Sequence, residues 1–150
     1  MKRILFTALG IACLSTPVFA IDKAEFKETG FEKERALLAN NPVFASNIKA
    51  GVVDVNKLGI DTIDVNGDGE KEILVHDYNS FSCGSQGCST YLFHKTGTQY
   101  LSILNLISGD AIAVGDKSSK NNGFRDIYVQ GGNGKPIRWS FDGKEYVLND

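Results

Sequence analysis

Several features that mark common protein classes are missing from this sequence. Its 16 lysines and arginines are outnumbered by 18 aspartates and glutamates, so no basic stripe is available to attract nucleic acid. No apolar run approaches the roughly 20 residues that a membrane-spanning helix needs. Cysteine is scarce, with three residues. Nucleic acid is therefore not an expected partner, and no membrane span is expected.

Signatures of catalysis are missing as well. No serine lies in a recognisable nucleophile elbow, and no glycine-rich loop precedes a helix as a phosphate-binding loop would. The glycines of residues 130–134 instead lie in a predicted hairpin. The acidic side chains of residues 64–72 cluster where a metal ion would engage them, so no glycosidase pair is visible. The sequence therefore predicts a non-enzymatic protein.

The first 20 residues have the pattern of an export signal. Lys2 and Arg3 precede an apolar core at residues 4–13, and residues 18–20 end in Ala20 with the small-residue pattern of a cleavage site. We expect cleavage after Ala20 and a periplasmic or secreted protein. Without Lys2 and Arg3, 14 basic residues face 18 acidic ones, a net charge of −4. Lipid attachment at Cys13 is disfavoured, because residues 9–12 match a lipobox poorly.

Removal of the signal leaves an even pair of cysteines, Cys83 and Cys88. In an oxidising compartment such a pair is most simply a disulfide, and the intervening glycines allow a short loop to close. The alternative is a zinc site that also uses His76 and His94. It is disfavoured because no C-x₂-C knuckle is present and both histidines lie in predicted strands.

The most informative stretch covers residues 64–72. Oxygen-bearing side chains stand at its first, third, fifth and ninth places, and a glycine stands at the sixth. Ca²⁺ prefers six to eight oxygen ligands, and a tight turn can supply them. We expect the side chains of four residues and the backbone carbonyl of a fifth to bind Ca²⁺. The side-chain ligands are Asp64, Asn66, Asp68 and Glu72, and the carbonyl belongs to Glu70.

This loop differs from an EF-hand. Its twelfth position is Val75, where an EF-hand requires a bidentate glutamate, and its flanks are rich in β-branched residues. A calcium loop between two strands is therefore expected. The remaining alternative is a hairpin turn whose acidic side chains are only solvated.

The loop resembles the D-x-N-x-D-G-x-x-D/E calcium loops of FG-GAP and VCBS-type β repeats. The resemblance implies calcium ligation by residues 64–72 at a turn between strands. Because a propeller needs several copies and this chain has one, we expect a single β domain. From residue 64 onward the chain also resembles a type of small exported bacterial domain, through residues 64–72, 83–88, 122–126 and 139–146. That resemblance implies location and fold, and no particular activity.

Helical periodicity is confined to the first part of the mature chain. Residues 31–39 contain good helix formers, Pro42 ends the pattern, and residues 42–50 favour a second short helix. We expect residues 21–57 to pack on a sheet, anchored by Phe26, Phe31 and Phe44. An exposed partner site on this segment is the alternative.

Residues 58–150 read as a series of strands and tight turns. Strands are expected near residues 58–65, 72–78, 89–95, 99–105, 124–129, 137–141 and 145–148. Asn133-Gly134 and Asp142-Gly143 are strong hairpin signals. Tyr91, Phe93, Trp139 and Phe141 alternate toward one face, and we expect them in the core rather than in a ligand platform. The predicted fold is mainly β (α+β): an antiparallel sheet, small β-sandwich or partial-propeller-like meander with one or two N-terminal helices.

Two functions remain open at this stage. The first is a monomeric protein-binding module, such as an inhibitor or immunity protein against a cell-wall hydrolase, since rigid loops enter an enzyme cleft with little loss of entropy. Ser108, Gly109 and Asp110, together with residues 116–123, are its candidate binding loops. The second is a calcium-dependent hydrolase of the cell envelope, for which His76 is the nearest candidate base.

Overall fold

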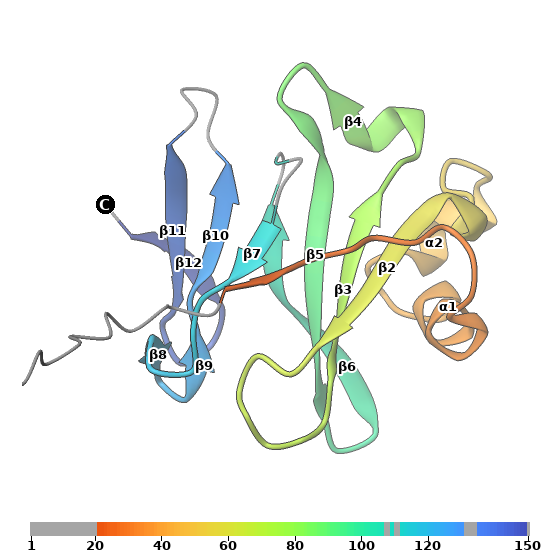
Figure 1. The fold of residues 1–150 in the computed structure, drawn as a ribbon. Helices are drawn as coiled ribbons and strands as arrows, with labels where there is room; N and C mark the ends of the chain where they lie inside the picture. Colours follow the sequence, from red (N-terminus) through yellow and green to blue (C-terminus); the bar gives the residue numbers. More distant parts are fainter. Residues whose placement is uncertain (1–20, 107–108, 110–111, 131–134, 150) are drawn as a thin grey trace, which may run out of the picture.

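The computed structural model describes residues 21–106, 109, 112–130 and 135–149. Within this part of the chain, two antiparallel sheets pack against each other, and two short helices cover the far side of the second sheet (Figure 1). The mainly β fold class with N-terminal helices is therefore confirmed. No helix among these residues is long and apolar enough to cross a membrane.

The first sheet has five strands, all paired antiparallel. In spatial order they are β1 (Asp22–Lys23), β7 (Ile112–Val114), β10 (Ile127–Gln130), β11 (Pro136–Phe141) and β12 (Tyr146–Asn149). The predicted hairpin at Asp142-Gly143 joins β11 to β12, and its turn is closed by the amide of Asp142, which donates to the carbonyl of Glu145. The hairpin predicted at Asn133-Gly134 lies outside the described residues.

The second sheet carries the acidic loop and the disulfide. Its strands are β2 (Leu58–Ile63), β3 (Glu72–Asp77), β5 (Gly87–Thr96) and β6 (Gln99–Leu106), and the short β4 (Cys83–Gly84) pairs with the start of β5. A separate two-residue ladder joins β8 (Lys120–Asn121) to β9 (Phe124–Arg125).

Helix α1 (Glu32–Ala39) and helix α2 (Ala45–Lys49) lie close to the predicted positions. Two 3₁₀ turns follow along the chain, η1 (Val55–Lys57) and η2 (Ser80–Ser82). Phe44 is the buried anchor of the helical segment, 2% exposed, and Phe31 packs at the edge of the same cluster. Phe26 packs instead against the core between the two sheets.

Strand β3 explains why the protein has two cores. All six of its residues are buried, because one face meets the other sheet and the opposite face meets the helices. Leu74 belongs to the inter-sheet core, whereas Ile73 and Val75 belong to the core under the helices. A strand covered on both faces is expected to be apolar throughout, and its polar residues must find partners.

The predicted aromatic core is confirmed in part. Phe93 is fully buried under the helices and Phe141 is buried between the sheets, whereas Tyr91 and Trp139 are only half-buried at the margins of those clusters. The period-2 alternation gave the correct face for each side chain. Alternation does not predict how deeply a side chain is buried, because burial depends on how far the opposite layer extends.

The N-terminal segment joins the two sheets. Asp22 and Lys23 pair with β7 of the first sheet, and Lys27 then forms a bridge with Ile60 of the second (Figure 1). Sequence patterning predicted no strand here, because a two-residue strand has too few side chains to show alternation. This short strand brings Asp22 to the buried Arg125, which contacts the acidic loop.

Candidate functional sites in the acidic loop and the disulfide hairpin

The acidic loop joins β2 to β3, two antiparallel neighbours, as predicted. The register closes with Ile63 opposite Glu72, so residues 64–71 form the excursion between the strands. Gly67 and Gly69 have φ values of 79° and 89°, a conformation that side chains with a Cβ rarely adopt. The glycine at the sixth place therefore has the turning role expected of it.

The side chains of the loop close it through backbone amides. Asp64 accepts from Gly67 at 2.5 Å with Oδ1 and from Gly69 at 3.2 Å with Oδ2. Asn66 Oδ1 accepts from the amide of Asp68, whose Oδ1 accepts in turn from the amide of Glu70 at 2.7 Å. The bond from Glu70 and a second from Asn66 hold the pKa of Asp68 below its usual value.

Glu72 has a different environment from the other four candidate ligands. It is 2% exposed; its Oε2 accepts from the amide of Val65 at 2.9 Å, and its Oε1 lies 2.9 Å from Nδ1 of His94. Burial raises the pKa of Glu72, and the bonds from Val65 and His94 oppose that shift. Its carboxylate is thus already engaged at the base of the loop.

Among the described residues, no three Asp, Glu, His or Cys side chains gather where they could hold a metal ion. The chemistry of the loop nevertheless suits a hard cation, because Asp64, Asn66 and Asp68 present oxygen and each carboxylate oxygen has more than one lone pair. Glu70 uses its side chain elsewhere, in an exposed ion pair with Lys95 at 3.3 Å, which leaves its carbonyl as the predicted donor.

Two residues that sequence reasoning missed hold the loop from the separate β8–β9 ladder. The ammonium group of Lys120 donates a hydrogen bond to the carbonyl of Asn66. The backbone amide of Arg125 donates to the carbonyl of Val65 at 2.7 Å, and the guanidinium of the same residue donates to the carbonyl of Asp64 at 3.2 Å. Both lie more than 50 residues along the chain, so no local spacing could indicate these contacts.

The disulfide between Cys83 and Cys88 is present, in the hairpin that joins β4 to β5. The zinc alternative is wrong for this arrangement, because the two sulfur atoms bond to each other. The two histidines also have other partners: His76 pairs with Thr90 Oγ1 at 2.7 Å, and His94 pairs with Glu72.

The candidate binding loops have mixed outcomes. Ser108 and Asp110 lie outside the described residues. Gly109 is buried, and a Cβ placed on it would meet Val129 at 2.3 Å, so this position is packed rather than presented. Residues 116–123 are largely exposed, as expected, and Asp116 closes their turn by accepting from Ser118.

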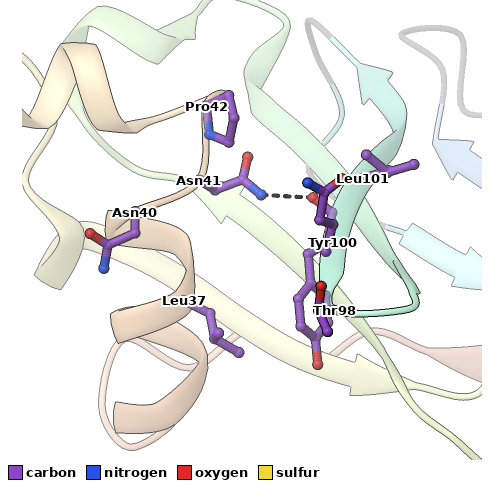
Figure 2. A pocket seen from close by; sticks show the side chains of 8 residues that line it. Leu37, Asn40, Asn41, Pro42, Thr98, Tyr100 and Leu101 are labelled. Atoms are coloured by element: carbon purple, nitrogen blue, oxygen red, sulfur yellow. Dashed lines mark hydrogen bonds between the residues drawn. The ribbon is translucent and has the colours of Figure 1, made fainter.

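Open hollows lie beside the helical segment and beside the disulfide. The first, about 380 Å³, lies between the end of α1 and the β5–β6 hairpin, where Asn41 Nδ2 donates to the carbonyl of Tyr100 at 2.8 Å (Figure 2). No carboxylate, imidazole or thiol lines it, and Asn41 fastens the helical segment to the edge of β6. The second, about 350 Å³, lies beside the disulfide.

Comparison of the chain with protein-family models, with curated proteins and with solved structures found no match. The resemblance to calcium-binding β repeats therefore depends on the residues of the loop alone and remains a prediction.

Proposed function

We propose that this protein is an exported, non-enzymatic β domain that is stabilised by Ca²⁺ and binds a protein partner, as an inhibitor or immunity protein against a cell-wall hydrolase. The observation that carries the proposal is the rigid presentation of a surface turn by the second sheet. The disulfide and the carboxylate of Asp77 together fix the turn between β3 and β5. A turn that is ordered before binding loses little conformational entropy in a complex.

The compartment follows from the cysteines and the first 20 residues together. Disulfides persist mainly in oxidising compartments, and the Cys83–Cys88 bridge is compatible with one. An export signal at residues 1–20 would deliver the chain there. The proposed location is the periplasm or the medium.

In this proposal Ca²⁺ has a structural role. Asp64, Asn66, Asp68 and the Glu70 carbonyl would hold it, and Glu72 would support the base of the loop through its bonds to Val65 and His94. The ion would supply the positive charge that the acidic side chains lack among themselves. The loop would then hold β2 and β3 in a fixed register.

One observation favours a second candidate, a calcium-dependent hydrolase. An imidazole–carboxylate pair, His94 with Glu72 at 2.9 Å, lies beside the loop, and His94 is 25% exposed. Such a pair can act as a general base when the imidazole reaches the substrate. His76, the base considered from the sequence, is 3% exposed and contacts Thr90, so we propose His94 for this role in its place.

One assay separates the two functions. Dye-labelled peptidoglycan is incubated with the purified exported protein alone, and with a panel of muramidases, amidases and endopeptidases, in Ca²⁺ or EGTA. We expect no dye release by the protein alone and dose-dependent slowing of at least one enzyme. Release by the protein alone that disappears in His94→Gln would establish the hydrolase instead. A panel that is unaffected at every dose would contradict the inhibitor.

A further inference from the structure

Phe81 is the most exposed large apolar side chain in the described part of the chain, at 84%. It lies in the middle of η2, in the turn that leaves β3 before the disulfide hairpin; β4, the next element, stands at one end of the second sheet (Figure 1). A single exposed apolar residue is ordinary on a protein surface, so the case for Phe81 depends on its surroundings. The surroundings of Phe81 are not those of a flexible loop.

A buried carboxylate organises the turn from below. Asp77 is 1% exposed, and its Oδ1 accepts from both the amide and Nδ2 of Asn79, at 3.0 and 2.6 Å. Its Oδ2 accepts from the hydroxyl of Ser82 at 2.5 Å. The residues on either side of the Ser80-Phe81 pair are therefore bonded to one buried acid. A charged acceptor strengthens each of these hydrogen bonds.

The turn is also fastened at its sides. Asn79 Oδ1 accepts from the amide of Asp54 at 2.8 Å, and its Nδ2 also donates to the carbonyl of Asp54. Ser89 donates its hydroxyl to the carbonyl of Ser82, and the disulfide closes the following hairpin. These contacts account for Asp77, Asn79 and Ser82 as structural residues. They give no structural reason for an exposed phenyl ring at the centre.

The segment that carries the ring has no charged side chain of its own. Between Asp77 and Lys95 the chain has no Asp, Glu, Lys or Arg, and the residues near the ring are mainly serine, glycine, asparagine and glutamine. A hollow of about 350 Å³, lined by Phe81, serines and the glycines of the hairpin, adjoins the ring. A rigid aromatic anchor among small hydrogen-bonding residues is the composition of protein-binding loops in antibodies.

We propose that Phe81 is the anchor with which this turn docks on a folded partner protein, whose surface offers an uncharged, apolar socket rimmed by hydrogen-bonding groups. The inference rests on the proposed protein-binding function and names the docking element for it. Buried aromatic anchors dominate many protein interfaces, and a partner with charges in the socket would leave them unpaired against this neutral turn. Membrane docking is disfavoured, because the turn has no basic residue to accompany its single apolar side chain.

The partner is found by cross-linking from the ring position. A photoreactive benzoyl-phenylalanine replaces Phe81 in the exported protein, expressed in its own cells, and the peptide joined to residue 81 identifies the partner. The control carries the same group in place of Leu148, which is 52% exposed on the first sheet. The identified protein is then purified, and its dissociation constant is measured with the parent, Phe81→Ala, Phe81→Tyr and Leu148→Ala.

We expect Phe81→Ala to weaken binding by about tenfold or more, as for an interface anchor, and Phe81→Tyr and Leu148→Ala to stay within about twofold of the parent. All variants should melt with the parent, because an exposed ring contributes little to the core. Equal affinity of the parent and Phe81→Ala for the partner would overturn Phe81 as anchor and leave the protein-binding function standing. If residue 81 joins no protein and the parent binds none, both ideas fail.

Other occupants are tested with defined probes on the same variants. These are vesicles of phosphatidylcholine, a neutral chitin oligosaccharide, and the protein itself in sedimentation. Binding of any of them that is lost in Phe81→Ala and kept in Leu148→Ala would assign the ring to that ligand and overturn a separate protein partner.

Discussion

Two neighbouring residues, Arg125 and Asp126, show how buried charge is handled in this protein. They are 3% and 0% exposed, yet they do not pair with each other, because successive side chains of an extended chain point in opposite directions. Arg125 turns toward Asp22 at 2.7 Å and the carbonyls of Gly115 and Asp64. Each charge therefore fastens a different part of the fold.

Asp126 has four donors around its two oxygens. Asn121 and Ser140 donate to Oδ1, and Arg138 donates two bonds to Oδ2, at 2.8 and 2.7 Å. The hydroxyl of Tyr146 donates to the adjacent carbonyl of Arg125, and burial raises the pKa of that tyrosine. The carboxylate of Asp126, which lies between β9 and β10, thus joins β8 to β11.

Asp126→Asn should be strongly destabilising although it keeps the shape of the side chain. One oxygen becomes an NH₂ group that faces donors, and Arg138 loses its counter-charge, so we expect a loss of about 3 kcal/mol or more in the free energy of unfolding. Urea denaturation measures it. The matched control is Glu145→Gln, an exposed acid in the next hairpin. A change below about 1 kcal/mol in Asp126→Asn would show that solvent reaches this carboxylate.

At the level of elements, the strands and helices were largely predictable and their partners were not. β-Branched or alternating patterns predict strands directly at residues 58–63, 72–77 and 136–141. The helix ends before Pro42 because a proline ring cannot be accommodated inside a helix. The division of the strands into two sheets depends on contacts across the whole chain. The pairing of β1 with β7 at the edge of the first sheet has no local signal at all.

The candidate sites divide in the same way. The disulfide and the acidic turn lie within short segments, so spacing alone indicated them. The clamp by Lys120 and Arg125, the pairing of Glu72 with His94, and the exposure of Phe81 depend on tertiary position. Spacing also suggested Glu72 as a calcium ligand, and only the structure shows that this ninth place is the first residue of a strand buried on both faces.

The disulfide hairpin should be oxidised and locally stabilising. Free-thiol labelling of unreduced protein is expected to find no reactive thiol. Closing a loop with a separation of five residues removes little chain entropy, so Cys83→Ser with Cys88→Ser should cost about 2 kcal/mol. Equilibrium unfolding in urea measures that cost. Two labelled thiols in the unreduced parent would contradict the bridge.

Considered as a whole, the molecule places the acidic loop where its two sheets meet. The loop extends β2 and β3 of the second sheet, while Lys120 and Arg125 of the β8–β9 ladder hold its carbonyls. Arg125 is bonded in turn to Asp22 in the N-terminal strand, which itself links the sheets. Order in the loop is therefore coupled to the docking of the two layers, and melting of either should loosen the other.

This coupling predicts that Ca²⁺ raises the stability of the whole fold. Residues 64–72 contain four acidic side chains, of which Glu70 and Glu72 pair with Lys95 and His94. A cation would neutralise the charge of the other two, and an ion bound to the folded loop adds its binding energy to folding. At free Ca²⁺ a hundredfold above the dissociation constant, the gain is about 2.7 kcal/mol. For a domain of this size that is a rise of several degrees in melting temperature. Mg²⁺ should substitute poorly, because it requires a smaller octahedral shell and retains its waters.

Thermal melting in EGTA, Ca²⁺ or Mg²⁺ tests the prediction on the parent and on Asp64→Asn with Asp68→Asn. Each asparagine keeps one acceptor oxygen, which can serve the amide of Gly67 at position 64 and the amide of Glu70 at position 68. The longer bond from Gly69, at 3.2 Å, is lost, and so is the charge that holds the ion. The double variant should melt at the same temperature in all three solutions. In the parent, the calcium-dependent gain in stability should extend to the first sheet through the bond from Arg125 to Asp22. Tryptophan fluorescence of Trp139, on that sheet, should then report the same calcium-dependent midpoint as circular dichroism. A parent whose melting temperature ignores millimolar Ca²⁺ would leave residues 64–72 as an acidic hairpin turn, closed by its own hydrogen bonds.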